Sequence, residues 1–200
     1  MLEFPQTVLE TLRQPLEDGV ISVNRVQSSC IYPARFMLVG AMNPCPCGFM
    51  GDPVKKCTCQ PFQIERYRSR LSGPLLDRMD IFIHVPRVNV DEIATKSAPT
   101  TTSAEFREQV MHAREKQLLR LRETGKTSNA EMTNKDIDTF CVLDATTNEL
   151  LQKAVQRLDL STRAYYRTLK LARTIADLAG SDNIASEHIT EALGYREKTK

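Results

Sequence analysis

The sequence predicts an α/β region followed by a separate, all-helical bundle. Residues 36–42 form a continuous apolar run without polar alternation, which is typical of a buried, parallel strand. Residues 97–103 read Ser-Ala-Pro-Thr-Thr-Thr-Ser, which is the composition of a linker. Beyond them, apolar residues recur mostly at helical spacing. We therefore expect the α/β part to cover residues 1–96, the linker 97–103 and the helical part 104–200.

A helix and a hairpin are expected at the start of the chain. Apolar residues recur at helical spacing between Gln6 and Leu16, and Gly19 then follows as a stop signal. Residues 20–25 and 30–32 have the composition of two short strands around a polar turn. This order predicts a β-hairpin directly after the first helix.

The buried strand at 36–42 ends abruptly at Asn43 and Pro44. In open α/β sheets, ligands bind at the carboxyl ends of strands, where a polar side chain can reach a bound phosphate or water. Asn43 is therefore a candidate binding residue, and the alternative is a core strand capped by an Asn-Pro turn. Further elements are expected to be an irregular loop at 44–61, a short basic helix at 63–71 and a second short strand at 80–86.

Start and stop signals divide the second part of the chain into five helices. Ser161 and the pair Ser186-Glu187 mark two helix starts, and Gly180 ends the helix between them. The predicted helices cover residues 104–123, about 133–141, 147–157, 161–179 and 186–196.

Charge and composition exclude several classes of protein. The chain has 200 residues and a formal net charge of +2, so it shows no global signal for binding a polyanion. No apolar run approaches the roughly 20 residues of a membrane span, and the N-terminus has no basic-then-apolar export signal. We therefore expect a cytoplasmic protein without a membrane partner. Since cytoplasmic thiols stay reduced, its six cysteines indicate metal binding or burial rather than disulfides.

Four of the cysteines form two Cys-x-Cys pairs separated by nine residues. Four thiolates can close a tetrahedral Zn²⁺ site, and such a site has no open position for catalysis. The spacing differs from the commoner Cys-x₂-Cys knuckle, so four thiols in a mobile loop, or a redox pair, are alternatives. Cys30 and Cys141 lie among apolar residues, and we expect both to be buried. The candidate zinc ligands are Cys45, Cys47, Cys57 and Cys59.

The order of several motifs resembles a known family. Two of the longest read Ala-Met-Asn-Pro-Cys-Pro-Cys-Gly at 41–48 and Ser-Gly-Pro-Leu-Leu-Asp-Arg-Met-Asp at 72–80. Together with the other motifs they resemble the C-terminal part of the magnesium-chelatase-like AAA+ ATPases of the ComM (YifB) type. The resemblance implies a partial AAA+ P-loop core with a β-hairpin insertion, followed by a helical lid. The other motifs cover residues 12–19, 32–39 and 161–177.

In this family, a phosphate-binding loop and an Asp-Glu strand that holds Mg²⁺ come before the segment seen here. The resemblance therefore implies that Met1 is an internal methionine, and that the chain is a fragment that cannot hydrolyse ATP alone. A Gly-Lys-Thr sequence at 125–127 is not a phosphate-binding loop. Arg120 stands where its first glycine belongs, and it follows a charged helix rather than a strand.

The resemblance also implies roles for three residues. Asn43 matches sensor 1, whose amide orients the attacking water or contacts the γ-phosphate. Arg78 matches the arginine finger, which reaches the nucleotide of a neighbouring subunit; without the resemblance, an ion pair with Asp77 or Asp80 is the simpler reading. Arg163 matches sensor 2, which contacts the nucleotide of its own subunit, and the alternative is a solvated arginine in the first turn of a helix.

The resemblance further implies that the hairpin lines the pore of a ring, with Arg25 facing DNA; the alternative is an ordinary edge hairpin. Between residues 55 and 78, six basic residues stand against two acidic ones. They form either a patch that follows phosphates or a solvated helix face or subunit contact. These basic residues are Lys55, Lys56, Arg66, Arg68, Arg70 and Arg78.

Two functions follow as hypotheses. The first is the sensor, arginine-finger and lid portion of a ring-forming AAA+ ATPase. The resemblance implies that the complete protein binds ATP and Mg²⁺, forms a homo-oligomer, expected to be a hexamer, and acts on DNA as a branch-migration helicase. The second is a non-enzymatic module, stapled by zinc, that binds a partner or a nucleic acid.

Overall fold

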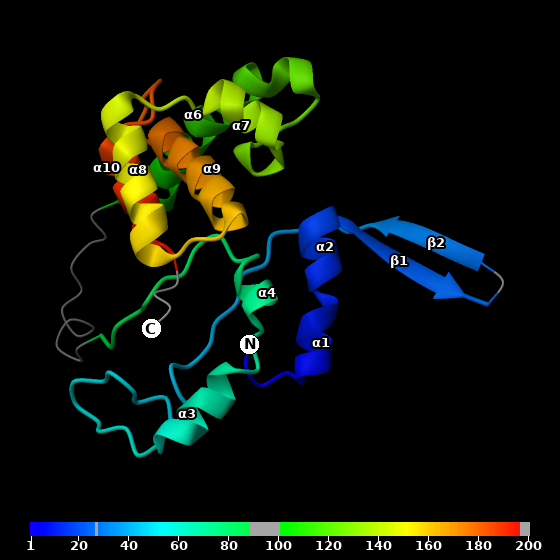
Figure 1. Ribbon diagram of the computed structural model, residues 1–200, viewed down its shortest axis with the longest axis vertical. Coiled ribbons are helices and arrows are strands. Elements are labelled where there is room, and N and C mark those ends of the chain that lie inside the picture. The colour runs from blue at the N-terminus through cyan, green and yellow to red at the C-terminus, as the bar shows by residue number, and fades with distance from the viewer. Residues whose placement is uncertain (27, 89–100, 197–200) are drawn as a thin grey trace. The chain divides into compact units, whose positions relative to one another are not determined.

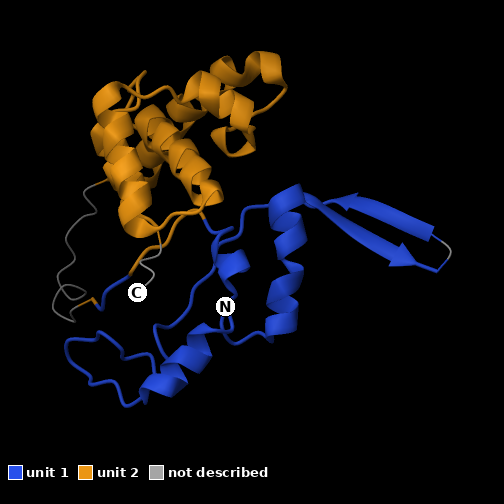
Figure 2. Cartoon of the chain, in the orientation of Figure 1, with its two compact units in different colours: residues 1–79, 85–87 blue, residues 80–84, 88–200 orange. Residues whose placement is uncertain are grey.

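The computed structural model describes residues 1–26, 28–88 and 101–196. The chain forms two compact units, shown in different colours in Figure 2. The first unit comprises Met1–Met79 with Val85–Arg87, and the second comprises Asp80–His84 with Val88–Lys200. The described residues combine helices with one two-stranded sheet, which is compatible with a partial α/β core and a helical region. None of the described helices is both long enough and apolar enough to cross a bilayer.

The first unit begins with two short helices, α1 (Gln6–Thr11) and α2 (Arg13–Asp18), where the sequence predicted one. Pro15 explains the interruption, because it has no N–H to donate to the carbonyl of Thr11. Gly19 ends α2 in the left-handed conformation, with φ 66°, and its N–H donates to the carbonyl of Pro15. The predicted stop is therefore confirmed.

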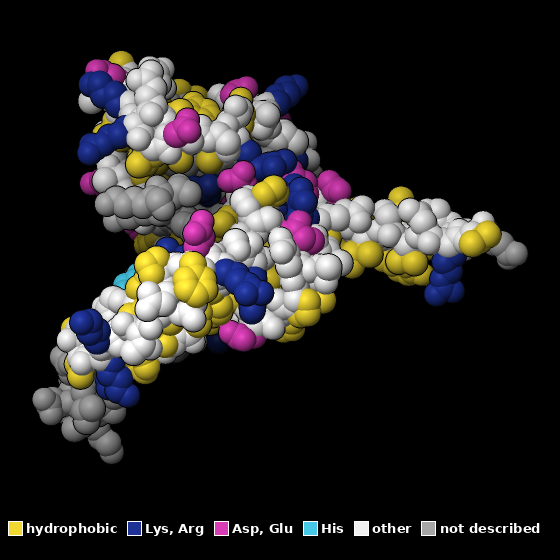
Figure 3. Space-filling model, turned by 60° about the horizontal axis from the view of Figure 1, so that its bottom comes forward, with side chains coloured by type: hydrophobic (Ala, Val, Ile, Leu, Met, Phe, Trp, Pro, Cys, Tyr) yellow, Lys and Arg dark blue, Asp and Glu magenta, His cyan; other side chains and the backbone are white. Residues whose placement is uncertain are grey.

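The predicted hairpin is present as strands β1 (Val20–Arg25) and β2 (Ser28–Pro33), labelled in Figure 1. The strands are antiparallel, and Ile21 pairs with Tyr32, so these two side chains share one face. Both are exposed, and Figure 3 shows apolar side chains along the hairpin. The prediction that Cys30 is buried was wrong, because β2 is exposed along its whole length.

The strands predicted at 36–42 and 80–86 are wrong in a way that has a physical cause. Both segments lie outside helices and strands, and Met37 and Val39 are 88% and 85% exposed. A strand needs a neighbour whose backbone groups complete its hydrogen-bond ladder. In the part of the chain that the structure describes, the only paired strands are β1 and β2.

Helices α3 (Pro61–Arg68) and α4 (Gly73–Leu76) complete the first unit. Gln60 is the N-cap of α3, and the side chain of Gln63 accepts the N–H of Gln60 at 2.9 Å. The apolar faces of α3 and α4 pack against residues from the start of the chain. The buried members of this core are Leu2, Leu9, Tyr67, Leu71 and Leu75.

The second unit is helical, and all five predicted helices are confirmed there. The N-cap side chains of Thr102, Thr133, Asp144 and Ser161 each accept a backbone N–H of the following helix. Of the predicted linker, residues 97–100 lie outside the described ranges, and Ser103 already belongs to α6. The elements are α6 (Ser103–Leu121), η1 (Arg122–Thr124), η2 (Asn129–Glu131), α7 (Asn134–Phe140), α8 (Ala145–Leu158), α9 (Thr162–Leu178) and α10 (Ser186–Gly194).

A buried ionic network joins α6, η2 and α9. The side chain of Asp177 is fully buried and accepts hydrogen bonds from Arg120, Arg173 and the amide of Asn129. Arg120 makes two bonds, at 2.5 and 2.8 Å, one to each carboxylate oxygen of Asp177. Arg173 also donates to the carbonyls of the turn after α9. This network satisfies charged groups that would otherwise be costly to bury.

The Gly-Lys-Thr sequence at 125–127 is a structural connection. Gly125 ends η1 with φ 69°, in the left-handed region. Lys126 pairs with Asp136 on α7 at 2.5 Å, and the N–H of Thr127 donates to Glu131. The pKa of Asp136 is lowered by the hydrogen bond from Lys126 and by those from Thr133. Lys126 is thus used in holding the helical unit together.

Candidate functional site

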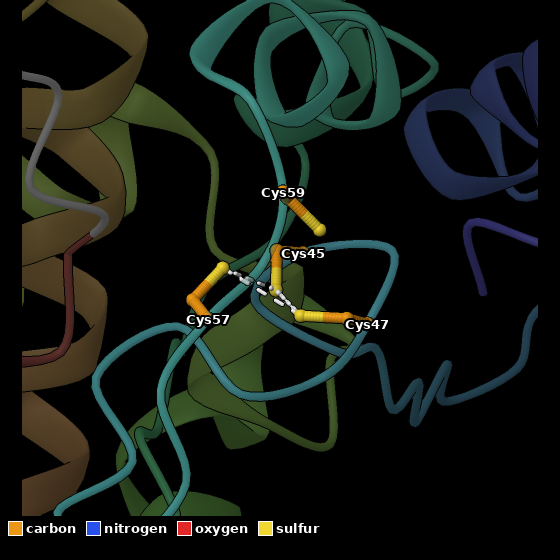
Figure 4. Close-up of side chains that lie close together, drawn as sticks. All are labelled: Cys45, Cys47, Cys57 and Cys59. Carbon is orange, nitrogen blue, oxygen red and sulfur yellow. Dashed lines mark hydrogen bonds between the residues drawn. The ribbon is translucent and has the colours of Figure 1, made fainter.

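The four predicted ligands come together at one point, as Figure 4 shows. Their sulfur atoms all lie within 4.8 Å of one another. The Sγ–Sγ distances are 3.4 Å for Cys45–Cys47, 3.7 Å for Cys45–Cys57 and 3.6 Å for Cys47–Cys57. Sulfurs placed about 2.3 Å from one zinc ion stand about 3.8 Å apart in a tetrahedron. The donor set therefore fits a zinc ion with shifts of a few tenths of an ångström for these three sulfurs.

Local turns fold the two arms of the loop onto each other. The N–H of Gly48 donates to the carbonyl of Cys45 at 3.0 Å, and Gly48 takes φ 82°, which favours glycine. Farther along, the Asp52 carboxylate accepts the N–H groups of Val54 and Lys55, both at 2.8 Å. These bonds lower the pKa of Asp52 and reverse the chain between the arms.

Backbone amides point at the sulfurs and shift their ionisation. The amides of Phe49 and Thr58 donate to the Cys47 sulfur and lower its pKa to about 5. The amide of Cys47 donates to the sulfur of Cys59, but burial and the neighbouring thiols raise the pKa of Cys59 to about 12. Four adjacent thiols cannot all ionise without a compensating charge, and a bound dication supplies that charge.

Asn43 lies at the entrance to this cluster, two residues before Cys45. Its side chain is exposed, with Cγ and Nδ2 both 3.8 Å from the position that a Cβ on Gly48 would occupy. The amide therefore lies over the first turn of the cysteine loop and stays accessible to a ligand. The sequence placed Asn43 at the end of a strand, and the structure places it in a segment outside helices and strands.

Arg78 follows α4 in the same unit and is held against α2. Its Nη2 pairs with the Glu17 carboxylate at 2.6 Å, and its Nη1 donates to the carbonyl of Pro74. The side chain of Arg78 is only 10% exposed. The acidic partner shown is thus Glu17, whereas the sequence suggested Asp77 or Asp80. Glu17 lies 61 positions away in the chain, and no local sequence pattern predicts this contact.

The remaining candidates are exposed. Arg163 lies in the first turn of α9, within the helical unit, and Arg25 ends β1 opposite Ser28. Of the basic residues between 55 and 78, Arg78 is mostly buried and the others are exposed. The Lys55 ammonium lies 5.0 Å from the centre of the Phe49 ring, so this side chain also makes a cation–π contact within the cysteine loop.

Comparison with known proteins covers both units. Residues 1–93 match the family described as magnesium chelatase, subunit ChlI, and residues 100–196 match the C-terminal region of the same subunit. The chain belongs to the magnesium chelatase ChlI family. This confirms the resemblance found in the sequence and assigns the chain to the AAA+ class. The exposed segments at 36–42 and 80–86 fall within the first match.

Curated relatives extend over almost the whole chain. Competence protein ComM of Haemophilus influenzae is 45% identical over 194 residues, which is 97% of this chain and 37% of the relative. Uncharacterized protein YifB of Escherichia coli is 40% identical over the same share. Uncharacterized protein Rv2897c of Mycobacterium tuberculosis is 37% identical over 98% of this chain and 38% of its own length. The chain thus spans a little over a third of the length of these relatives.

Proposed function

We propose that this chain is the sensor, arginine-finger and lid portion of a ring-forming AAA+ ATPase that acts on DNA as a ComM-like branch-migration helicase. The observation that carries the proposal is the family match across both units, together with 45% identity to a protein named for competence. In the complete protein, ATP and Mg²⁺ are the cofactors, and the ring is a homo-oligomer, expected to be a hexamer. The protein is expected in the cytoplasm.

Three side chains act on the nucleotide in this proposal. Asn43 offers an exposed amide, which both donates and accepts, to the attacking water or the γ-phosphate. Arg78 serves the site of a neighbouring subunit, where its fork of N–H groups stabilises charge on the γ-phosphate. Its pairing with Glu17 means that the guanidinium exchanges one anionic partner for another on assembly. Arg163 acts from the lid, at the exposed start of α9.

DNA is the proposed partner of the hairpin. Strand β1 of the exposed hairpin ends at Arg25, whose positive charge suits a phosphate backbone. The exposed basic residues of α3 and of the cysteine loop are a second candidate contact with phosphates, as given by the sequence.

The metal proposed for the four cysteines is a structural Zn²⁺. We expect the purified 200-residue chain to carry one zinc ion, and the double variant Cys57→Ser/Cys59→Ser to lose it, because two thiolates do not close a tetrahedral site. Metal content measured by elemental analysis checks this. Cys30→Ser is the matched control, since Cys30 lies on β2 and not in the cluster. Equal zinc content in the double variant and the parent chain would contradict the proposed zinc site.

Restoring the rest of the protein tests the enzymatic proposal. We define the chimaera as the H. influenzae relative in which this chain replaces the matching 194 residues. The isolated chain is expected to show no ATP turnover, whereas the chimaera hydrolyses ATP and assembles into a ring when nucleotide is added. Turnover by the isolated chain would contradict the proposal. An inactive, monomeric chimaera would favour the zinc-stapled binding module instead.

A further inference from the structure

We propose that the four-cysteine centre is a positioning device for Asn43, so that metal occupancy sets the rate of ATP hydrolysis rather than only the stability of the loop. The inference rests on the proposed function, since it takes the cysteines as zinc ligands and Asn43 as the residue that acts on the nucleotide. It adds a link between these two sites.

The first part of the link is covalent and stiff. Only Pro44 separates Asn43 from Cys45, and Pro46 follows Cys45 directly. Proline fixes its own φ and restricts the residue before it to extended backbone. Few free rotations therefore remain between the Cys45 sulfur, which is fully buried, and the backbone of Asn43. Fixing the sulfur on a metal fixes the asparagine within narrow limits.

The second part of the link is a direct contact. The turn at 45–48 brings Gly48 back beneath the Asn43 side chain, 3.8 Å from the position of a Cβ. The same turn is held by Cys47, whose sulfur accepts the amides of Phe49 and Thr58. Because Thr58 lies on the other arm, the surface on which the Asn43 amide rests depends on both pairs of cysteines.

The third part of the link ties this loop to the body of the unit. Cys59 is followed directly by Gln60, the N-cap of α3, whose Tyr67 is buried in the core. From the same helix, the Nε of Arg68 donates to the carbonyl of Pro44 at 3.4 Å. A metal that joins the two arms therefore fixes Asn43 relative to α3. Without the metal, the turn at Asp52, the thiol contacts and this long hydrogen bond are left to hold the arms.

The kinetic consequence is separable from binding. A shift of about 1 Å in a group that positions reactants costs about 100-fold in rate. Nucleotide affinity depends mainly on the phosphate loop expected in the rest of the protein, so it is little affected. Loss of the metal is therefore expected to lower kcat about 100-fold, while KM for ATP changes little.

A double-mutant cycle in the chimaera tests this link. The variants are Asn43→Ala, Cys57→Ser/Cys59→Ser and the combination of the three substitutions. If the metal acts through Asn43, its loss lowers kcat in the parent chimaera but has no further effect once Asn43 is alanine. If the metal only stabilises the fold, its loss lowers kcat by the same factor in both backgrounds, and the inference is overturned.

A second measurement does not depend on turnover. Amide hydrogen exchange is measured in the 200-residue chain, once with zinc as the only added ligand and once without zinc. Zinc is expected to slow exchange at the amides of residues 47–49 and 58, which lie in the turn or donate to sulfur. Zinc-independent exchange there would overturn the inference even if the cysteine variant failed to fold.

The two levels of failure are distinguishable. If Asn43→Ala alone leaves kcat unchanged, the proposed role of Asn43 fails. If the parent protein contains no metal, the zinc proposal fails. If both hold and the effects of metal loss and Asn43→Ala are additive, only the link fails.

Discussion

Replacing Arg78 by alanine in the chimaera is expected to lower ATP turnover by about 1,000-fold or more, because an arginine finger contributes about 10³ to 10⁵ in rate. Steady-state ATPase assays at saturating ATP measure the change. Arg13→Ala is the matched control, since Arg13 belongs to the same unit and pairs with Glu10 at the surface. We expect Arg13→Ala to change turnover little.

A loss of fold must be separated from a loss of chemistry. Arg78→Ala leaves Glu17 without the 2.6 Å pair, so part of its effect falls on the packing of α4 against α2. Arg78→Lys keeps the positive charge near Glu17 but loses the fork that spans two phosphate oxygens. We expect the lysine variant to assemble with nucleotide and still turn over slowly. Parent-like turnover in Arg78→Ala would contradict the arginine-finger role.

The second large effect concerns stability. Asp177→Asn is expected to destabilise the helical unit by about 3 to 5 kcal/mol, the usual cost of breaking a buried ion pair. The substitution keeps the shape of the side chain but leaves Arg120 and Arg173 facing a neutral group. Urea unfolding of the 200-residue chain, followed by the helical circular dichroism signal, measures the change.

Asp182→Asn is the control for this stability measurement. Its side chain is 94% exposed and pairs with Lys116 at the surface. Only its backbone carbonyl contacts Arg173, and that group is unchanged in the variant. We expect a change within about 0.5 kcal/mol. If Asp177→Asn is as small, the buried network does not stabilise the unit in the way its geometry indicates.

Most of the helices could be predicted from the sequence because their signals are local. Ser161 caps the helix that it begins, and Gly19 ends α2 through its own left-handed backbone. The strands at 36–42 and 80–86 could not, because a strand depends on a neighbour that the local sequence does not specify. These apolar runs were predicted to be strands, but no partner strand for them lies within the described residues.

The candidate site divides in the same way. The cysteine cluster could be predicted from the residue type and from the two Cys-x-Cys pairs, which lie only nine residues apart. The partner of Arg78 and the network around Asp177 did not follow. Arg120 and Asp177 stand 57 positions apart, and only the packing of α6 against α9 brings them together. Contacts of this kind are set by tertiary structure and leave no periodic trace.

A mixing experiment tests most directly whether this chain acts on the nucleotides of a ring. In the proposed ring, Asn43 acts within its own subunit and Arg78 acts on the next, so the Asn43→Ala and Arg78→Ala chimaeras would lack different halves of one site. When the two are mixed and allowed to assemble, intact sites form wherever an Arg78→Ala subunit receives the arginine of an Asn43→Ala neighbour. The account predicts turnover far above that of either variant alone. Turnover no higher than the average of the two would contradict it.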